Sequence, residues 1–132
     1  MQYSLDTNIV VDIIRGNLRL KLKLQELENK QITCCITPIV LSELFKGAYK
    51  AQRQNEAIKL VEDFAENVDF LDFNESACRF FGQRHAELLR LGKQTQEADL
   101  MIGAISLAHD AILVTNNQKD FHNIRGLKIE SW

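Results

Sequence analysis

Short apolar stretches alternate with longer amphipathic stretches along the whole chain, and this alternation limits the possible folds more than any other feature. The short stretches are nearly all apolar, which predicts buried strands, and the longer ones repeat apolar residues every three or four positions, which predicts helices. We expect strands at 2–5, 31–36, 68–73 and 111–115, with an edge strand at 127–130. We expect helices after Asp6, over 18–27, from Thr37 to near Gly47, and over 52–66, 75–91, 95–109 and 118–122.

Polar residues and glycines at the boundaries support this assignment. Thr7 or Asn8 can cap the first helix, Thr37 precedes a proline at a first helical position, and Thr95 can cap the helix after Gly92. Positions 18–24 alternate leucine with basic residues, a strand pattern when taken alone, but the leucines continue at helical spacing through position 27. Buried strands that alternate with helices predict an α/β fold, with a parallel sheet between layers of helices.

The length and composition predict one domain that spans residues 1–132. One proline and six glycines leave no linker, and no apolar stretch is long enough to cross a bilayer. The N-terminus lacks a basic region followed by an apolar one, so we expect a soluble, cytoplasmic protein without a signal peptide. Cys34, Cys35 and Cys78 form no metal-binding or disulfide pattern, and we expect them to be buried free thiols.

Four acidic residues are expected at one edge of the sheet. Asp6 ends the first strand, Glu43 lies in the helix directly after the second strand, and Asp120 follows the fourth strand by a few residues. Asp99 lies near the start of the helix that leads into the fourth strand, and that helix must begin at the same edge. Open α/β folds bind ligands at this edge. Taken singly, each acid also has an ordinary explanation as a helix cap, a first-turn acid or a turn residue.

A cluster of carboxylates needs protons or a cation, because two of them about 5 Å apart repel by roughly 3 kcal/mol at an effective dielectric of 20. The predicted ligands are all hard oxygens, which favours Mg²⁺ or Mn²⁺ over zinc. A carboxylate-bound Mg²⁺ activates water and stabilises the transition state of phosphodiester cleavage. The residues therefore predict a metal-dependent nuclease.

Two groups of basic residues are candidates for binding the nucleic-acid backbone, although the net charge is −2. The stretch from 13 to 25 contains no acid, and neither does the stretch from 44 to 55. The candidate RNA-binding residues are Arg15, Arg19, Lys21, Lys23 and Lys46; Lys50 and Arg53 belong to the second group. A basic stretch is also compatible with an ordinary solvated face.

The sequence resembles the VapC toxins, PIN-domain ribonucleases of toxin–antitoxin pairs, in an ordered set of motifs along essentially the full chain. These motifs are Leu5-Asp6-Thr7-Asn8, Ser42-Glu43-Leu44 with Lys46-Gly47, Ala98-Asp99-Leu100-Met101-Ile102, and Leu113-Val114-Thr115 through Asn117-Gln118-Lys119-Asp120-Phe121. Gly103 stands where many members have alanine, a small-for-small exchange that leaves the resemblance intact.

The resemblance implies a PIN α/β/α sandwich with a parallel sheet of four to five strands in the order 3-2-1-4-5. It implies that Asp6 and Asp99 are the principal metal ligands and that Glu43 and Asp120 complete the catalytic site, with Asp120 also a metal ligand. Thr7 would orient Asp6 or a bound water, and Asn117 would play a supporting role.

The resemblance further implies an RNA substrate, often tRNA, a VapB-type antitoxin as partner, and a homodimer. The closing segment 126–132 is similar to that of members that cut initiator tRNA. Hydrolysis would leave 5′-phosphate and 3′-hydroxyl ends.

Three other functions are alternatives to a ribonuclease. A signalling receiver domain would need a pair of acids after the first strand and a late Lys-Pro turn, but Asp6 is alone there and the only proline is Pro38. A non-catalytic binding module with the same fold, and a structure-specific DNA nuclease with the same carboxylates, both remain open at this point.

Overall fold

The computed structural model describes all 132 residues and contains one five-stranded sheet with the order β3-β2-β1-β4-β5. Every neighbouring pair of strands is parallel. The elements are β1 (Gln2–Leu5), α1 (Thr7–Ile14), α2 (Leu18–Asn29), β2 (Thr33–Ile36), α3 (Pro38–Lys50), α4 (Gln54–Glu66), β3 (Asp69–Phe70), α5 (Glu75–Arg90), α6 (Glu97–Ala108), β4 (Ile112–Val114), the 3₁₀ helix η1 (Gln118–Asp120) and β5 (Ile129–Glu130). The expected fold class and strand order are confirmed.

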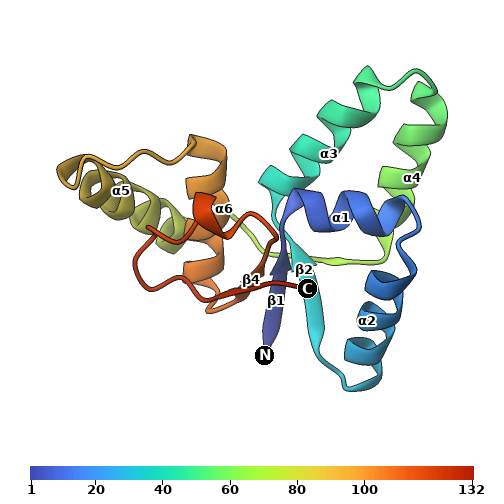
Figure 1. Cartoon of the computed structure of the whole chain (residues 1–132), viewed down its shortest axis with the longest axis horizontal. Coiled ribbons are helices and arrows are strands. Elements are labelled where there is room, and N and C mark those ends of the chain that lie inside the picture. Colours follow the sequence, from blue (N-terminus) through green and yellow to red (C-terminus); the bar gives the residue numbers. More distant parts are fainter.

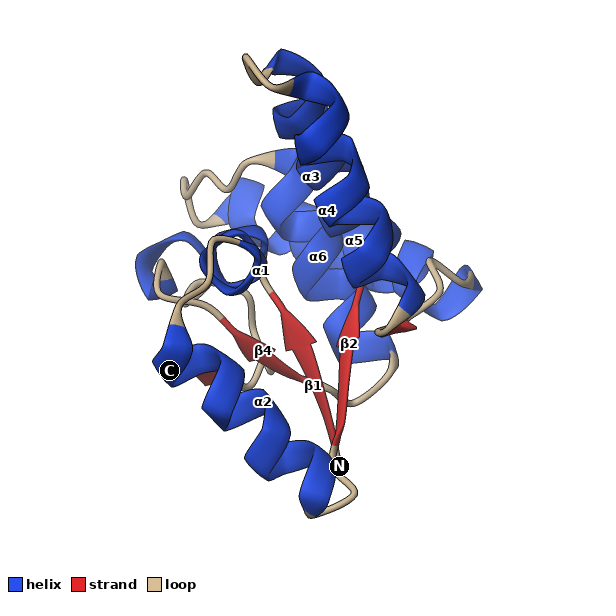
Figure 2. Cartoon of the chain, turned by 90° about the vertical axis from the view of Figure 1, so that its right-hand side faces the viewer, coloured by secondary structure: helices blue, strands red, loops and turns tan.

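Helices lie on both sides of the sheet, with α1 and α2 on one side and α5 and α6 on the other (Figures 1 and 2). The helix pair α3 and α4 extends past the edge at which β1 and β2 end. The chain leaves β1 toward β2 on one side, and β4 lies on its other side, so the order of the strands reverses between β1 and β4. This is the position at which open α/β sheets bind ligands.

The core explains why these sequences form these elements. Leu5, Ile36 and Leu113, one from each of the three central strands, are fully buried, together with Ile9 of α1 and Ile102 of α6. Because both faces of a parallel sheet are covered by helices, its strands are apolar on both faces. None of the helices combines the length and the apolar composition that a membrane crossing requires.

Several expected boundaries differ from the structure. The helix expected to stop near Gly47 continues to Lys50, because the turn beyond the glycine is anchored by the buried Ala48. That packing outweighs the cost of glycine in a helix, about 1 kcal/mol relative to alanine. The third strand is only Asp69–Phe70, and the helix expected at 118–122 is a single 3₁₀ turn.

Two of the expected helix caps are wrong, and so is the expectation that all three cysteines are buried. Asp6, not Thr7 or Asn8, caps α1, and Gln96, not Thr95, precedes α6 without donating or accepting a side-chain capping hydrogen bond. Thr37 caps α3 as expected, since its hydroxyl accepts from the backbone N–H of Val40 at 3.1 Å. Among the three free cysteines Cys35 is buried, Cys34 is half-buried and Cys78 is exposed.

Candidate active site

Asp6 is the most firmly held acid of the site. It follows β1 directly and is only 6% exposed. Its Oδ1 accepts from the backbone N–H of Thr7 at 2.9 Å, and its Oδ2 accepts from the hydroxyl of Thr115 at 2.8 Å. Burial raises the pKa of Asp6, as do the carboxylates of Glu43 and Asp120, while the two hydrogen bonds lower it. Asp6 is therefore a buried carboxylate with a fixed orientation.

Thr115 is a site residue that the sequence interpretation missed. It follows β4 directly, is fully buried, and its hydroxyl donates to Asp6 while it accepts from the backbone N–H of Asn117 at 3.0 Å. The available signal was its position as the first polar residue after an apolar strand. Asn117 contributes through this backbone contact, which ties the segment leading to Asp120 to the end of β1.

Glu43 is brought to the site by the direction of α3. This helix begins at the carboxyl end of β2, and Glu43 lies in its second turn, where the Thr7 hydroxyl donates to Glu43 Oε1 at 2.6 Å. Thr7 was expected to orient Asp6 or a water molecule. Its hydroxyl is instead directed to Glu43, and its backbone N–H contacts Asp6, so Thr7 links the two carboxylates.

Asp99 and Asp120 approach the same place from the other side. Asp99 lies in the first turn of α6 and is half-buried, whereas Asp120 ends η1 and is exposed. Burial raises the pKa of Asp99 to about 6, and repulsion from Asp6, Asp120 and Glu43 contributes in that order. Neither Asp99 nor Asp120 accepts a hydrogen bond within the chain through its side chain. Glu43 and Asp120 each contribute to the raised pKa values of both Asp6 and Asp99, so the four carboxylates lie close to one another.

The donor chemistry of this cluster suits a hard divalent cation, because every side chain in it supplies carboxylate oxygens. No three His, Cys, Asp or Glu side chains are already arranged to hold a metal ion. Without a cation the carboxylates repel one another, and Asp99 and Asp120 have no hydrogen bonds that hold them closer. The four carboxylates are therefore not pre-assembled as a metal site in the structure.

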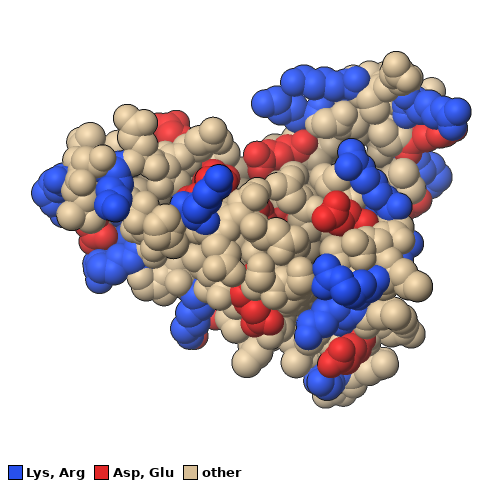
Figure 3. Space-filling view, viewed as in Figure 1, with Lys and Arg blue, Asp and Glu red and all other residues tan.

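The basic residues do not all face this cluster. Figure 3 shows a notch between the side formed by α6 and the projecting helix α3, with acidic side chains at its base and basic side chains on α3. Lys46 lies on α3, three residues after Glu43, and is exposed. Arg15 and Lys21 are also exposed, but Arg15 follows α1 and Lys21 lies on α2.

Two other basic residues of that first group contact the C-terminal residue. Arg19 donates to the backbone oxygen of Trp132 at 3.3 Å, and the Lys23 ammonium lies 5.8 Å from the centre of the Trp132 ring. Only part of the first basic group is therefore free to meet a ligand.

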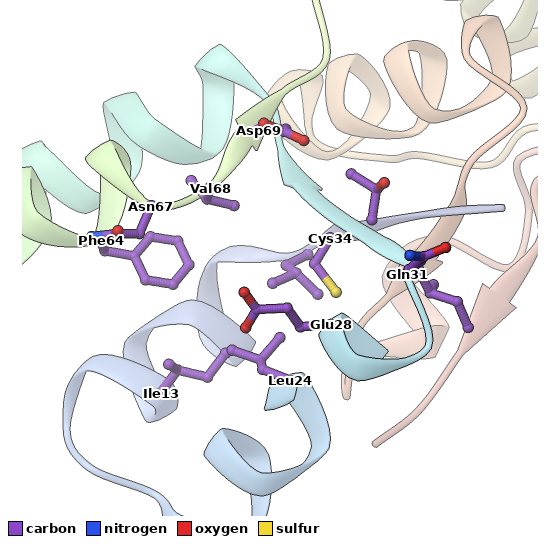
Figure 4. A pocket seen from close by; sticks show the side chains of 12 residues that line it. Ile13, Leu24, Glu28, Gln31, Cys34, Phe64, Asn67, Val68 and Asp69 are labelled. Carbon is purple, nitrogen blue, oxygen red and sulfur yellow. The ribbon is translucent and has the colours of Figure 1, made fainter. Parts of the chain in front are cut away.

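A separate cavity of about 470 Å³ lies between α2, α4 and the sheet. Figure 4 shows Ile13 and Leu24 on one side of this cavity and Phe64 and Val68 on the other. None of Glu43, Asp99 or Asp120 lines it, and burial raises the pKa of the lining Cys34 thiol to about 11, which keeps the thiol neutral. The cavity has acidic lining residues of its own, Glu28 and Asp69, and it is separate from the carboxylate cluster at the end of β1.

Comparison with known proteins agrees with the geometry at the end of β1. The PIN domain family matches residues 3–127. The chain is 33% identical over 135 residues to the tRNA(fMet)-specific endonuclease VapC of Shigella flexneri, with 100% of this chain and 98% of that protein covered. This chain belongs to the PIN-domain family, and within it to the VapC proteins. It is also 33% identical to ribonuclease VapC2 of Haemophilus influenzae over 133 residues, with the same coverage.

Solved VapBC structures share the fold along the full VapC length. The crystal structure of VapBC2 from Rickettsia felis bound to a DNA fragment from its promoter contains a chain that matches with a TM-score of 0.93 and 32% identity, covering 100% of this chain and 99% of that one. DNA-bound VapBC from Salmonella typhimurium matches with a TM-score of 0.92 and 30% identity, covering 100% and 98%. The expected family is confirmed.

Proposed function

We propose that this VapC protein is a metal-dependent endoribonuclease and the toxin of a toxin–antitoxin pair. The observation that carries the proposal is the buried Asp6, held by Thr115 and Thr7, with Glu43, Asp99 and Asp120 close enough to raise carboxylate pKa values. A carboxylate cluster whose charge repulsion lowers stability is typical of a functional site. Relatives named as ribonucleases or endonucleases that match over the full length support the same assignment.

We propose Mg²⁺ as the cofactor, with Mn²⁺ able to substitute, held by Asp6, Asp99 and Asp120. When bound, such a cation activates water and neutralises charge on the phosphate undergoing attack. Thr115 and the Thr7 backbone fix the orientation of Asp6 before substrate arrives. The Thr7 hydroxyl occupies Glu43 Oε1 and leaves Oε2 available to accept a proton from water.

The proposed substrate is RNA, and tRNA in particular. The support for initiator tRNA is the resemblance of segment 126–132 to that subgroup, together with the name of the Shigella relative. A hydrolytic mechanism predicts products with 5′-phosphate and 3′-hydroxyl ends. Products with a 2′,3′-cyclic phosphate would instead make the ribose hydroxyl the nucleophile and would contradict hydrolysis by an activated water.

The proposed partner is a VapB-type antitoxin, because the matching solved structures are VapBC complexes. We also propose that the protein is a homodimer and that it acts in the cytoplasm, where tRNA is found. Size determination of the chain alone and with its antitoxin tests both assemblies. A monomer at every concentration tested would contradict the dimer.

The direct test is cleavage of total tRNA and ribosomal RNA by antitoxin-free protein with Mg²⁺, with EDTA, and with the Asp99→Asn variant, followed by mapping of the ends. Discrete cuts that require both the metal and Asp99 are expected. A single-stranded DNA of the same sequence, tested in parallel, distinguishes an RNA nuclease from a DNA nuclease. A folded wild-type protein that cuts neither nucleic acid would support the non-catalytic binding module instead.

A further inference from the structure

The helix α3 continues the site outward along one of its faces. Glu43, Lys46 and Lys50 are spaced three and four residues apart, so they lie on the same side of this helix. At 1.5 Å per residue, Lys46 lies about 5 Å and Lys50 about 10 Å beyond Glu43 along the helix axis. Glu43 is fixed at the carboxylate cluster by the Thr7 hydroxyl, so the two lysines extend from the cluster toward solvent.

These two lysines are free of internal partners. Both are exposed, and neither makes an ion pair or a side-chain hydrogen bond within the chain. Some other cations are engaged: Arg53 lies 3.8 Å from Glu56, Lys59 pairs with Asp63 at 3.1 Å, and Arg19 contacts Trp132. Because an acidic cluster repels phosphate groups, uncompensated positive charge beside it favours the approach of a polyanion. Lys46 and Lys50 are the basic residues of α3, and Figure 3 shows basic side chains on the α3 side of the notch.

An exposed aromatic ring lies beside the lysines. Tyr49 is 60% exposed and is a surface neighbour of Lys46, which precedes it by three residues. The centre of the half-buried Phe45 ring lies 6.5 Å from the centre of the Tyr49 ring. Positive charge combined with an exposed aromatic ring is the arrangement by which proteins bind single-stranded nucleic acid, through phosphate contacts and base stacking.

We propose that Lys46, Tyr49 and Lys50 form an RNA-binding platform on α3, in which the lysines hold the phosphate backbone leading away from the carboxylate cluster and Tyr49, beside Lys46, stacks an unpaired base at the outer part of α3. The platform rests on the proposed ribonuclease function and extends it by assigning the substrate contacts to α3. It also requires the bound RNA to be unpaired at this position, since a base within a duplex has no free face for the tyrosine.

The test compares steady-state cleavage by wild type, by Lys46→Gln/Lys50→Gln, and by Tyr49→Ala with Tyr49→Phe as its matched variant. The lysine variant is expected to raise KM about tenfold or more with kcat unchanged. In filter binding with Asp6→Asn in every protein, it should also lower the salt dependence of single-stranded RNA binding by about 1.4 in log–log slope, about 0.7 for each lost phosphate contact. Tyr49→Ala should raise KM about tenfold while Tyr49→Phe stays close to wild type.

A double variant of two exposed lysines in surface ion pairs, Lys30→Gln/Lys59→Gln, serves as the control with the same change in net charge, and its KM should remain within about twofold of wild type. An equal rise in KM for this control would show that the loss of net positive charge, and not its position on α3, weakens RNA binding, and would overturn the platform. Unchanged KM values in an active enzyme would also overturn it, and so would variants that cleave RNA normally but lose antitoxin binding. If wild type itself does not cleave RNA, the proposed function fails first, and the two failures are thereby distinguished.

Discussion

The two sides of the carboxylate cluster are built differently. On the side of β1, Asp6 and Glu43 each accept a hydrogen bond from a threonine hydroxyl, and Asp6 is almost fully buried. On the side of α6, Asp99 and Asp120 accept none, and the pKa of Asp99 is raised to about 6 by burial and by its acidic neighbours.

The difference shows which part of the site the fold fixes in advance. The β1 side has a geometry set by hydrogen bonds, so it can act as a rigid support for a ligand. The α6 side is held only by the backbone, and its charge is unfavourable until a proton or a cation compensates it. Cation binding at this site should therefore be linked to proton release and to stability.

The largest effect on activity is expected for Glu43→Gln, which tests the β1 side of the cluster. The amide oxygen of glutamine can still accept the Thr7 hydroxyl, so the local hydrogen bond is preserved. The negative charge and the capacity to accept a proton are lost, and kcat should fall at least about 100-fold. Thermal unfolding should shift little. A large drop in the melting temperature would show that Glu43 has a structural role instead.

The next effect is expected for Thr115→Val, which removes the donor to Asp6 and leaves the Asn117 N–H without its acceptor. Burying an unsatisfied polar group costs about 1–3 kcal/mol, and loss of the ligand's orientation should weaken Mn²⁺ binding about 10- to 100-fold. The measurements are chemical denaturation and Mn²⁺ titration.

Thr7→Val is the matched variant for Thr115→Val. It removes a donor to Glu43 but keeps the backbone N–H that contacts Asp6, so its effect on Mn²⁺ affinity should be smaller. If the two substitutions weakened Mn²⁺ binding equally, the special role of the Thr115 contact would be excluded.

Asp99→Asn tests the α6 side of the cluster and should stabilise the metal-free protein. A carboxyl whose pKa is raised from 3.8 to about 6 favours the protonated folded state, so stability is lost as the pH rises from about 4 to about 6 and is level above that. In EDTA at pH 7.5 the variant should be more stable than wild type by about 1 kcal/mol, allowing for the partial exposure of Asp99. At pH 5 this difference should shrink. An equal or lower stability of the variant at pH 7.5 would contradict the unfavourable charge.

The smallest effect is expected for Gly103→Ala on α6. A Cβ at this position would lie 2.8 Å from Ile124 Cδ1, so the end of that flexible side chain must move. The gain in helix propensity, about 1 kcal/mol, offsets the cost of this shift. The net change in unfolding free energy should stay within about 1 kcal/mol. Chemical denaturation followed by circular dichroism measures it. A loss of several kcal/mol would show that α6 and the segment after Asp120 are packed more rigidly than the geometry indicates.

The sequence predicted the positions of the acids better than their surroundings. Strand and helix periods were enough to place Asp6, Glu43, Asp99 and Asp120 at one edge, because the direction of each element decides where its ends lie. The strand order came from the family resemblance and not from the periods. The hydrogen bond from Thr115 to Asp6 joins residues 109 positions apart, and no local pattern could assign it.

The sequence also could not separate the two basic groups. Both read as acid-free stretches, and only the tertiary structure shows that Arg19 and Lys23 contact the terminal Trp132 while Lys46 and Lys50 remain unpaired. The end of α3 was misjudged for a similar reason. Gly47 is a helix breaker by propensity, but the burial of Ala48 decides the outcome.

The most direct test of the carboxylate site is calorimetric titration of the antitoxin-free protein with Mn²⁺, for wild type and for Asp6→Asn and Asp99→Asn. We expect wild type to bind Mn²⁺ and to release protons near pH 6, and each substitution to weaken Mn²⁺ binding by at least about tenfold while the protein stays folded. Mn²⁺ binding that is unchanged in both variants, or absent from well-folded wild type, would contradict a metal site at these carboxylates.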